Sequence, residues 1–418
     1  MVSTLTSFLA LYMAVFTLLT GVGLLGTFLS LRMTVAGFST EVIGLILAAY
    51  YVGLVMGSFV CQRLVARVGH IRTFAAMAAV ATAAVMLHGV FFSAWAWGLL
   101  RLVTGIAIIG LYMVIESWLN ECTEPRFRGR VFSFYMVLSY LGIGFGQILL
   151  NLADPSLPTH FFIAGMLLAL CLVPVSMTTA ISPSMPPPSR FNLFALLKKA
   201  PLGMAGCLTA GLINSAFYSM GPVFAHAIDL SVSQLSLLMG ATVLGGLLLQ
   251  WPVGLISDRF DRTRVLPVLS VLVATISSLV VLTAGLPFAG LLVIMVCFGG
   301  VFFTIYPVAV ARSHDLFDAG EVVSVSTGLL ISYGIGACIG PVAAAFVMKT
   351  VNSPYGLFAF MAVVPIVYAA MAHFLRRREM IVIVPVADQS TYMPMMRTST
   401  VAMVIDPRTE SEKMPSGQ

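Results

Sequence analysis

The sequence predicts an all-α integral membrane protein of twelve transmembrane helices arranged as two six-helix halves. Three observations predict this fold class. Of the 418 residues, 59% are hydrophobic and only 9% are charged, whereas a soluble globular chain carries about 25% charged residues. Long uncharged runs recur along the chain, and the loops between them alternate in basic content. The composition excludes a cytosolic enzyme, a disordered protein and a nucleic-acid-binding protein, despite a net charge of +6.

Twelve runs are long enough to cross a bilayer, which takes about 20 apolar residues per helix. They are also longer and more continuously apolar than the tilted strands of a membrane barrel. The first run is uncharged to Leu31 and exceeds the apolar core of a cleavable signal, so we expect it to remain as a span. The expected spans are 5–31, 41–61, 73–92, 95–119, 131–152, 161–181, 202–226, 235–256, 266–284, 288–311, 322–348 and 355–375.

Lys and Arg residues orient these spans. With an even span number, both termini and alternate loops lie on one side of the membrane, and that side holds 19 of the 22 basic residues. The exceptions are Arg32, Arg101 and Lys349. Because short cytoplasmic loops are enriched in Lys and Arg, we expect both termini in the cytoplasm. An error of one span would destroy this bias.

The longest interior loop, 182–200, contains three consecutive prolines and divides the chain into two sets of six spans. We therefore expect an N-terminal half at 1–181, a cytoplasmic linker at 182–200 and a C-terminal half at 201–375. The tail, 376–418, is polar, and its apolar run at 380–386 is too short to span. A mostly disordered or surface-lying cytoplasmic tail is expected.

The cysteines and histidines are dispersed. Six of each occur, without the paired spacing of a disulfide framework or a metal site. We expect no metal and no cofactor.

The two halves resemble each other at an offset of 192 residues. The motif Gly-Ile-Gly at 142–144 matches Gly-Ile-Gly at 334–336, and Arg67 matches Arg259. Six-plus-six repeats are a known architecture of secondary transporters, with the substrate site near the midplane between the halves.

The loop at 254–264 reads Gly-Leu-Ile-Ser-Asp-Arg-Phe-Asp-Arg-Thr-Arg and resembles the signature loop of the major facilitator superfamily. The first-half copy keeps two positions of the pattern but has Ala66 where an acidic residue is expected. The resemblance covers the membrane part and implies the fold of that superfamily. It also implies a gating motif made of Gly254, Asp258, Arg259 and Arg262, with Gly69 and Arg67 in the first half.

A narrower resemblance lies in spans four and five. The segment Leu-Tyr-Met-Val-Ile-Glu-Ser-Trp-Leu-Asn at 111–120, followed by Arg-Gly-Arg-Val at 128–131, resembles the YcaD-like branch. This resemblance implies a multi-pass protein of the bacterial inner membrane and leaves the substrate open. The family's antiporter motif lacks its proline in span five, while Gly336, Gly340 and Pro341 echo it in span eleven.

Arg101 is the clearest embedded charge. It lies six residues inside Trp95, roughly 9 Å along a helix. Two interpretations remain open: its side chain snorkels to the interface, or it faces a cavity and binds an anionic group of the substrate. Tyr112 falls near the same helical stripe, so the two side chains are expected to share an environment.

Glu116 follows Arg101 by fifteen residues, about 22 Å, so the two cannot pair directly. Either its carboxylate pairs with a loop arginine, Arg72 or Arg130, or it is a proton site within the membrane.

Three further polar residues are candidates for the substrate pathway: Asn214, Tyr218 and Tyr306. Interhelical hydrogen bonding would explain them without a ligand. The resemblance favours a cavity, because spans one, four, seven and ten line the central cavity in that superfamily.

Together these features predict an alternating-access secondary transporter of a small organic solute, with protons as the coupling partner. The protein is expected to be a monomer in the lipid bilayer. A drug-type efflux antiporter is the alternative. An intramembrane enzyme or a channel would need converging catalytic groups or a selectivity ring, and the scattered polar residues favour neither, so we expect no enzyme activity.

The resemblance also suggests a role for Asp258. The loop after span eight would meet the N-terminus of span five, near Gly129 and Arg130, when the cytoplasmic side is closed. A carboxylate there would be stabilised by the positive helix end. We therefore expect Asp258 to be a latch for the outward-facing state.

Overall fold

The computed structural model describes residues 9–121, 123, 127–177, 193–317, 321–377, 381–390 and 392–393. Long α-helices dominate this part of the chain, as expected for segments that satisfy their backbone hydrogen bonds internally. In chain order the elements are α2 Leu9–Val35, α3 Thr40–Val68, α4 His70–Val90, α5 Ala94–Glu121, α6 Arg128–Ile148, η2 Leu149–Leu152, α7 Thr159–Leu170, α8 Leu172–Ser176, α9 Leu193–Lys199, α10 Pro201–Ala227, α11 Val232–Arg259, α12 Arg262–Leu282, α13 Phe288–Phe302, α14 Ile305–His314, α15 Val322–Thr350, α16 Gly356–Arg377 and η4 Val386–Asp388.

Eleven helical stretches in the described residues are long and apolar enough to cross a membrane, counting α7 with α8 and α13 with α14 as one stretch each. The twelfth expected span, 202–226, corresponds to α10, which has 27 residues but is not among these eleven stretches. Most α10 residues are buried against other helices. A helix sheltered from lipid by its neighbours does not need an apolar surface all round, which is why composition alone understates α10.

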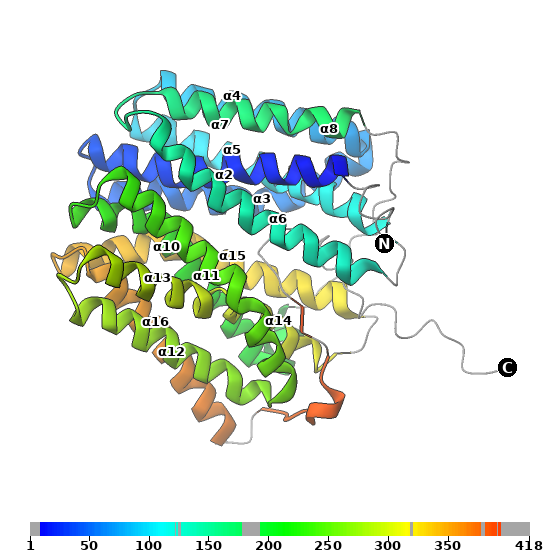
Figure 1. The fold of residues 1–418 in the computed structure, drawn as a ribbon. Helices are drawn as coiled ribbons and strands as arrows, with labels where there is room; N and C mark the ends of the chain where they lie inside the picture. Colours follow the sequence, from blue (N-terminus) through cyan, green and yellow to red (C-terminus); the bar gives the residue numbers. More distant parts are fainter. Residues whose placement is uncertain are drawn as a thin grey trace.

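The helices form two groups (Figure 1). Helices α2 to α8 make one group and α10 to α16 the other. Across the interface α3 packs against α15, α6 against α11, and α2 against α10. The interface therefore brings together segments that are more than 80 residues apart in the sequence, and it contains the site described below.

The two ends of the bundle differ in what they carry. One end holds the start of α2, the turns at Gly69 and at 260–261, and the tail residues 381–390 and 392–393 (right in Figure 1). We call it the basic end. The other end holds the turns at 36–39, 91–93, 153–158, 228–231, 283–287 and 351–355, and we call it the opposite end. Of the expected linker 182–200, residues 182–192 lie outside the described part of the chain.

Glycines let helices of one group approach closely. Gly53 of α3 and Gly105 of α5 face each other, and a Cβ added to Gly53 would lie 2.2 Å from the carbonyl oxygen of Leu102. Helices in lipid have little hydrophobic driving force to associate, so the close packing that small residues permit holds them together instead.

The two groups are joined at the opposite end. Ser30 of α2 donates a hydrogen bond to the carbonyl oxygen of Ser219 of α10 at 2.6 Å, and Ser236 of α11 donates to that of Gln147 of α6 at 2.5 Å. Lys349 of α15 forms an ion pair with Glu41 of α3. The groups are thus held together at this end by polar contacts that involve three helices of each group.

At the basic end, part of the tail is packed. The sequence predicted a mostly disordered or surface-lying tail. Most of residues 381–390 are exposed, while Ile381, Tyr392 and Met393 are only 8%, 7% and 6% exposed. The contacts lie mainly with α11, α12 and α14, and they are described with the signature loop below.

Candidate functional site: a cavity between the two groups of helices

A cavity of about 280 Å³ lies between the two groups of helices. Its wall combines residues of α2, α3, α5 and α6 with residues of α10, α14 and α15. The volume approaches the lower end of the range for small-molecule sites, roughly 300–1,000 Å³. A small solute held here would contact both groups at once.

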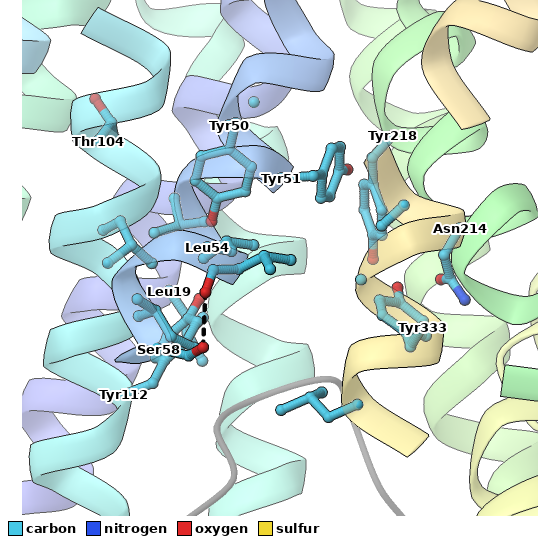
Figure 2. A pocket seen from close by; sticks show the side chains of 18 of the residues that line it. Leu19, Tyr50, Tyr51, Leu54, Ser58, Thr104, Tyr112, Asn214, Tyr218 and Tyr333 are labelled. Carbon is cyan, nitrogen blue, oxygen red and sulfur yellow. Dashed lines mark hydrogen bonds between the residues drawn. The ribbon is translucent and has the colours of Figure 1, made fainter. Parts of the chain in front are cut away.

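On the first wall of the cavity, formed by α2, α3, α5 and α6, the charged side chain of Arg101 lies close to two tyrosines. The guanidinium of Arg101 lies 4.3 Å from the ring centroid of Tyr50, a cation–π arrangement, and Arg101 is only 5% exposed. Tyr51 is the neighbour of Tyr50 on α3 and extends from this wall toward Tyr218 of the other group (Figure 2). The Arg101 side chain therefore lines the cavity rather than extending to the membrane–water interface.

The second wall of the cavity, formed by α10, α14 and α15, carries aromatic rings and the side-chain amide of Asn214. Tyr306 of α14 and Tyr333 of α15 pack edge to face, with ring centroids 5.0 Å apart. The Tyr306 hydroxyl is buried and has no hydrogen-bond partner within the described chain. Asn214 donates to the carbonyl oxygen of Ala210 at 3.0 Å, and it faces the same space as Tyr333 (Figure 2). This wall offers ring surfaces and hydrogen-bonding groups but no charge.

Charge is therefore one-sided in the cavity. Among the described residues that line the cavity, none is Asp, Glu or Lys, and Arg101 is the only arginine. A cation in a low-dielectric cavity raises the local potential and favours an anionic ligand.

Glu116 lies behind the cavity wall rather than in it. The residue is fully buried, and the Tyr135 hydroxyl of α6 donates a 2.8 Å hydrogen bond to its Oε1. Tyr112, which does line the cavity, is one helical turn away on the same face of α5. The α5–α6 contact thus places a carboxylate next to the cavity without exposing it there.

The structure brings most of the predicted pathway residues together. Five of the six line the cavity, namely Arg101, Tyr112, Asn214, Tyr218 and Tyr306. Sequence reasoning missed other tyrosines of the wall, because a tyrosine within an apolar run resembles an ordinary packing residue. Those missed are Tyr50, Tyr51, Tyr140 and Tyr333.

The signature loop forms a separate polar cluster at the basic end. The guanidinium of Arg262 bridges two carboxylates, Asp258 at 2.7 Å and Asp315 at 2.5 Å, and its side chain is fully buried. Asp261 caps α12 by accepting a hydrogen bond from the Thr263 amide at 2.8 Å. The loop therefore joins the end of α11 to the start of α12 and the end of α14.

The remaining residues of the predicted gating motif occupy different settings. Gly254 is buried on α11, and Arg259 is exposed at its end. In the first group, Arg67 is exposed at the end of α3, and Gly69 forms the turn to α4 with φ of +87°. A side chain at that φ would be strained, so the turn favours glycine.

Two helical groups with a cavity at their interface define a membrane transporter of small molecules. The sequence comparison makes the class specific, because the family model of the Major Facilitator Superfamily matches residues 11–304 and 208–387. The chain belongs to this superfamily, and it is a secondary transporter rather than an enzyme.

Relatives and solved structures agree with this assignment. The chain is 28% identical over 354 residues to the uncharacterized MFS-type transporter YcaD of Salmonella arizonae and to that of Salmonella typhimurium, covering 84% of this chain and 91% of each relative. Its fold is similar to the nucleoside transporter NupG, with a TM-score of 0.73, 14% identity, and coverage of 90% and 98%. It is also similar to a bacterial homolog of the lysosomal transporter Spinster in an inward-facing and occupied conformation, with a TM-score of 0.71, 15% identity, and coverage of 92% and 97%.

Proposed function

We propose that this protein moves a small organic solute with an anionic group across the bacterial inner membrane by alternating access, coupled to protons. The single observation that supports the substrate charge is the position of Arg101. Its guanidinium lines the cavity between the two groups, and no acidic residue is among the described residues of that wall. The tyrosines around it suit an apolar or aromatic body next to the anionic group.

The basic end is proposed to face the cytoplasm, with both termini on that side. The bias of 19 of the 22 basic residues toward this end supports the orientation. The hydrogen bonds near Ser30 and Ser236 join the groups at the opposite end, while cavity-lining Gln62 lies six residues before the end of α3 at the basic end. These features support a conformation open toward the cytoplasm.

Glu116 is proposed as the proton site. A buried carboxylate that accepts a hydrogen bond from Tyr135 is costly to keep charged within a membrane. Its place one turn from Tyr112 would let its protonation state influence the cavity through the packing of α5 and α6.

Asp258 is proposed as the latch of the alternate state. Its carboxylate stays 34% exposed although it pairs with Arg262. It therefore retains a face that could meet the positive N-terminal end of α6 when the two groups close at the basic end.

The test uses purified protein and a panel of matched ligands. Aromatic and aliphatic carboxylates, the corresponding neutral amides and amines of the same size are compared for thermal stabilisation of the protein in detergent. We expect carboxylates to raise the Tm, and amides and amines of the same shape to leave it unchanged. The best carboxylate is then assayed for uptake in proteoliposomes with and without a proton gradient. Stabilisation by amines in preference to carboxylates would contradict the proposed substrate charge.

A drug-type efflux antiporter is the second candidate. The aromatic wall, with the Tyr306–Tyr333 pair, supports it, because stacked rings bind flat hydrophobic molecules without a charge requirement. The ligand panel separates the two functions. Efflux of neutral aromatic compounds at the same rate as the matching carboxylates would favour the antiporter.

A further inference from the structure

Several tail residues, among them Val382, Ser390 and Tyr392, contact the signature loop and the end of α14. The backbone of Ser390 contacts two of the charged groups there: its amide donates to Asp315 Oδ1 at 2.9 Å, and its carbonyl oxygen accepts from Arg262 Nη2 at 2.5 Å. The Ser390 hydroxyl also donates to Asp315 Oδ1 at 2.7 Å. Arg312 of α14 donates to the carbonyl oxygen of Val382. A hydrogen bond between a charged side chain and a backbone group is stronger than one between two neutral groups.

The same segment engages Asp258. The backbone amide of Tyr392 donates to Asp258 Oδ1 at 2.8 Å, the same oxygen that pairs with Arg262. Asp258 is the carboxylate proposed to latch the alternate state. In this structure the tail therefore occupies one of the hydrogen-bonding positions of the Asp258 carboxylate.

Gly254 accommodates the aromatic ring of Tyr392. A Cβ built on Gly254 would lie 2.4 Å from a ring carbon of Tyr392, a distance that packing does not tolerate. The Tyr392 hydroxyl has no hydrogen-bond partner within the described residues. The ring thus docks by shape, and the first glycine of the signature loop provides the space.

We propose that the tail residues 381–390 and 392–393 are a strap that binds the signature loop and favours the conformation open at the basic end. The strap does so by competing with the N-terminal end of α6 for Asp258. This inference rests on the proposed latch role of Asp258. Release of the strap would free the carboxylate, so that closure at the basic end becomes more favourable and turnover rises when closure limits it.

Docking is tested first, without reference to transport. Spin labels are placed at Asp388→Cys and Arg264→Cys in a chain whose native cysteines are replaced, and the distance distribution is measured in nanodiscs. We expect a narrow distribution for the parent chain and for Tyr392→Phe, which keeps the ring. Tyr392→Ala should give a broad distribution. A broad distribution in the parent chain would overturn the strap.

Control of the conformational equilibrium is tested next, with labels at Arg72→Cys and Arg264→Cys on the two groups. A chain ending at Arg377 lacks the strap, and a chain ending at Met396 keeps it and serves as the matched control. We expect the shorter chain to raise the closed-to-open ratio at the basic end by about tenfold to a hundredfold, the size expected for losing a hydrogen-bonded contact to a charged group. The control chain should match the full chain.

A double variant separates the strap from the latch. In the chain ending at Arg377, Asp258→Asn should return the ratio toward that of the full chain, because the freed carboxylate is then absent. An unchanged ratio after removal of the strap, with docking intact in the full chain, would overturn the strap's role in the equilibrium. An effect of strap removal that Asp258→Asn leaves untouched would instead contradict the latch.

Discussion

Gln250 of α11 donates a hydrogen bond from Nε2 to the phenolic oxygen of Tyr140 of α6 at 2.7 Å, across the interface between the two groups of helices. Both residues are buried, at 3% and 2% exposure. Tyr140 also lines the cavity. A direct polar link between the groups, at the contact of α6 with α11, therefore lies beside the proposed substrate site.

The first prediction concerns this link. Tyr140→Phe removes the acceptor and leaves the Gln250 amide buried, so the free energy of unfolding should fall by about 1–3 kcal/mol. Gln250→Leu in the Tyr140→Phe background should recover part of that loss, because both polar groups are then replaced. Chemical unfolding of the two single variants and the double variant measures the coupling. Additive losses would show that the two side chains act independently.

The second prediction concerns Arg101. Arg101→Ala should abolish binding of a carboxylate ligand, and Arg101→Lys should retain part of it if the cavity requires positive charge. Equal losses would point to the paired geometry of the guanidinium. Arg32→Ala is the matched control, since Arg32 lies on α2 and donates to the carbonyl oxygen of Pro155 outside the cavity. Isothermal titration with the best ligand of the panel provides the measurement.

The third prediction concerns the proton site. Glu116→Gln keeps the side-chain volume but cannot carry a proton, so gradient-driven uptake should fall at least tenfold while ligand binding changes little. Tyr135→Phe should cause a smaller loss, because it removes only the hydrogen bond to Glu116. Glu41→Gln, which disrupts the ion pair with Lys349 at the opposite end, is the control for losing a carboxylate. Normal gradient-driven uptake by Glu116→Gln would reject this role.

The fourth prediction concerns closure of the opposite end. A Cβ on Gly44 of α3 would lie 2.8 Å from the carbonyl oxygen of Pro341 and 2.9 Å from the Cβ of Ala345 on α15. Gly44→Ala should therefore separate the groups there and increase cysteine accessibility from that side. Gly98→Ala is the control, because no atom lies within 4 Å of its added Cβ. Equal accessibility in the two variants would contradict this packing argument.

The fifth prediction concerns the latch and the orientation. Asp258→Asn should increase labelling of cavity cysteines from the cytoplasmic side and slow turnover, whereas Ala66→Ser in the first group should have a much smaller effect. A reporter fused after Gln418 should be active only in the cytoplasm. Activity of the fusion on the outer side would show that the basic end faces away from the cytoplasm.

The sequence by itself determined that the chain is a helical membrane protein and which superfamily it resembles. Span length, loop charge and the Gly-Leu-Ile-Ser-Asp-Arg motif are local features, and a bilayer imposes the same local rule on every span because backbone groups must be satisfied within the helix. Arg101 was also recognisable locally, since a charge in an apolar run is costly wherever it lies.

Only the tertiary structure decided which residues meet. Tyr50 and Tyr333 lie in ordinary apolar runs, and they become cavity residues because α3 and α15 pack across the interface. Glu116 looked equivalent to Arg101 in the sequence, yet the rotation of α5 places it behind the wall, against Tyr135. The docking of Tyr392 on Gly254 joins residues 138 positions apart, and no local pattern encodes a contact that depends on the shape of another helix. Long-range packing is decided by the complementarity of whole surfaces, which a single segment does not contain.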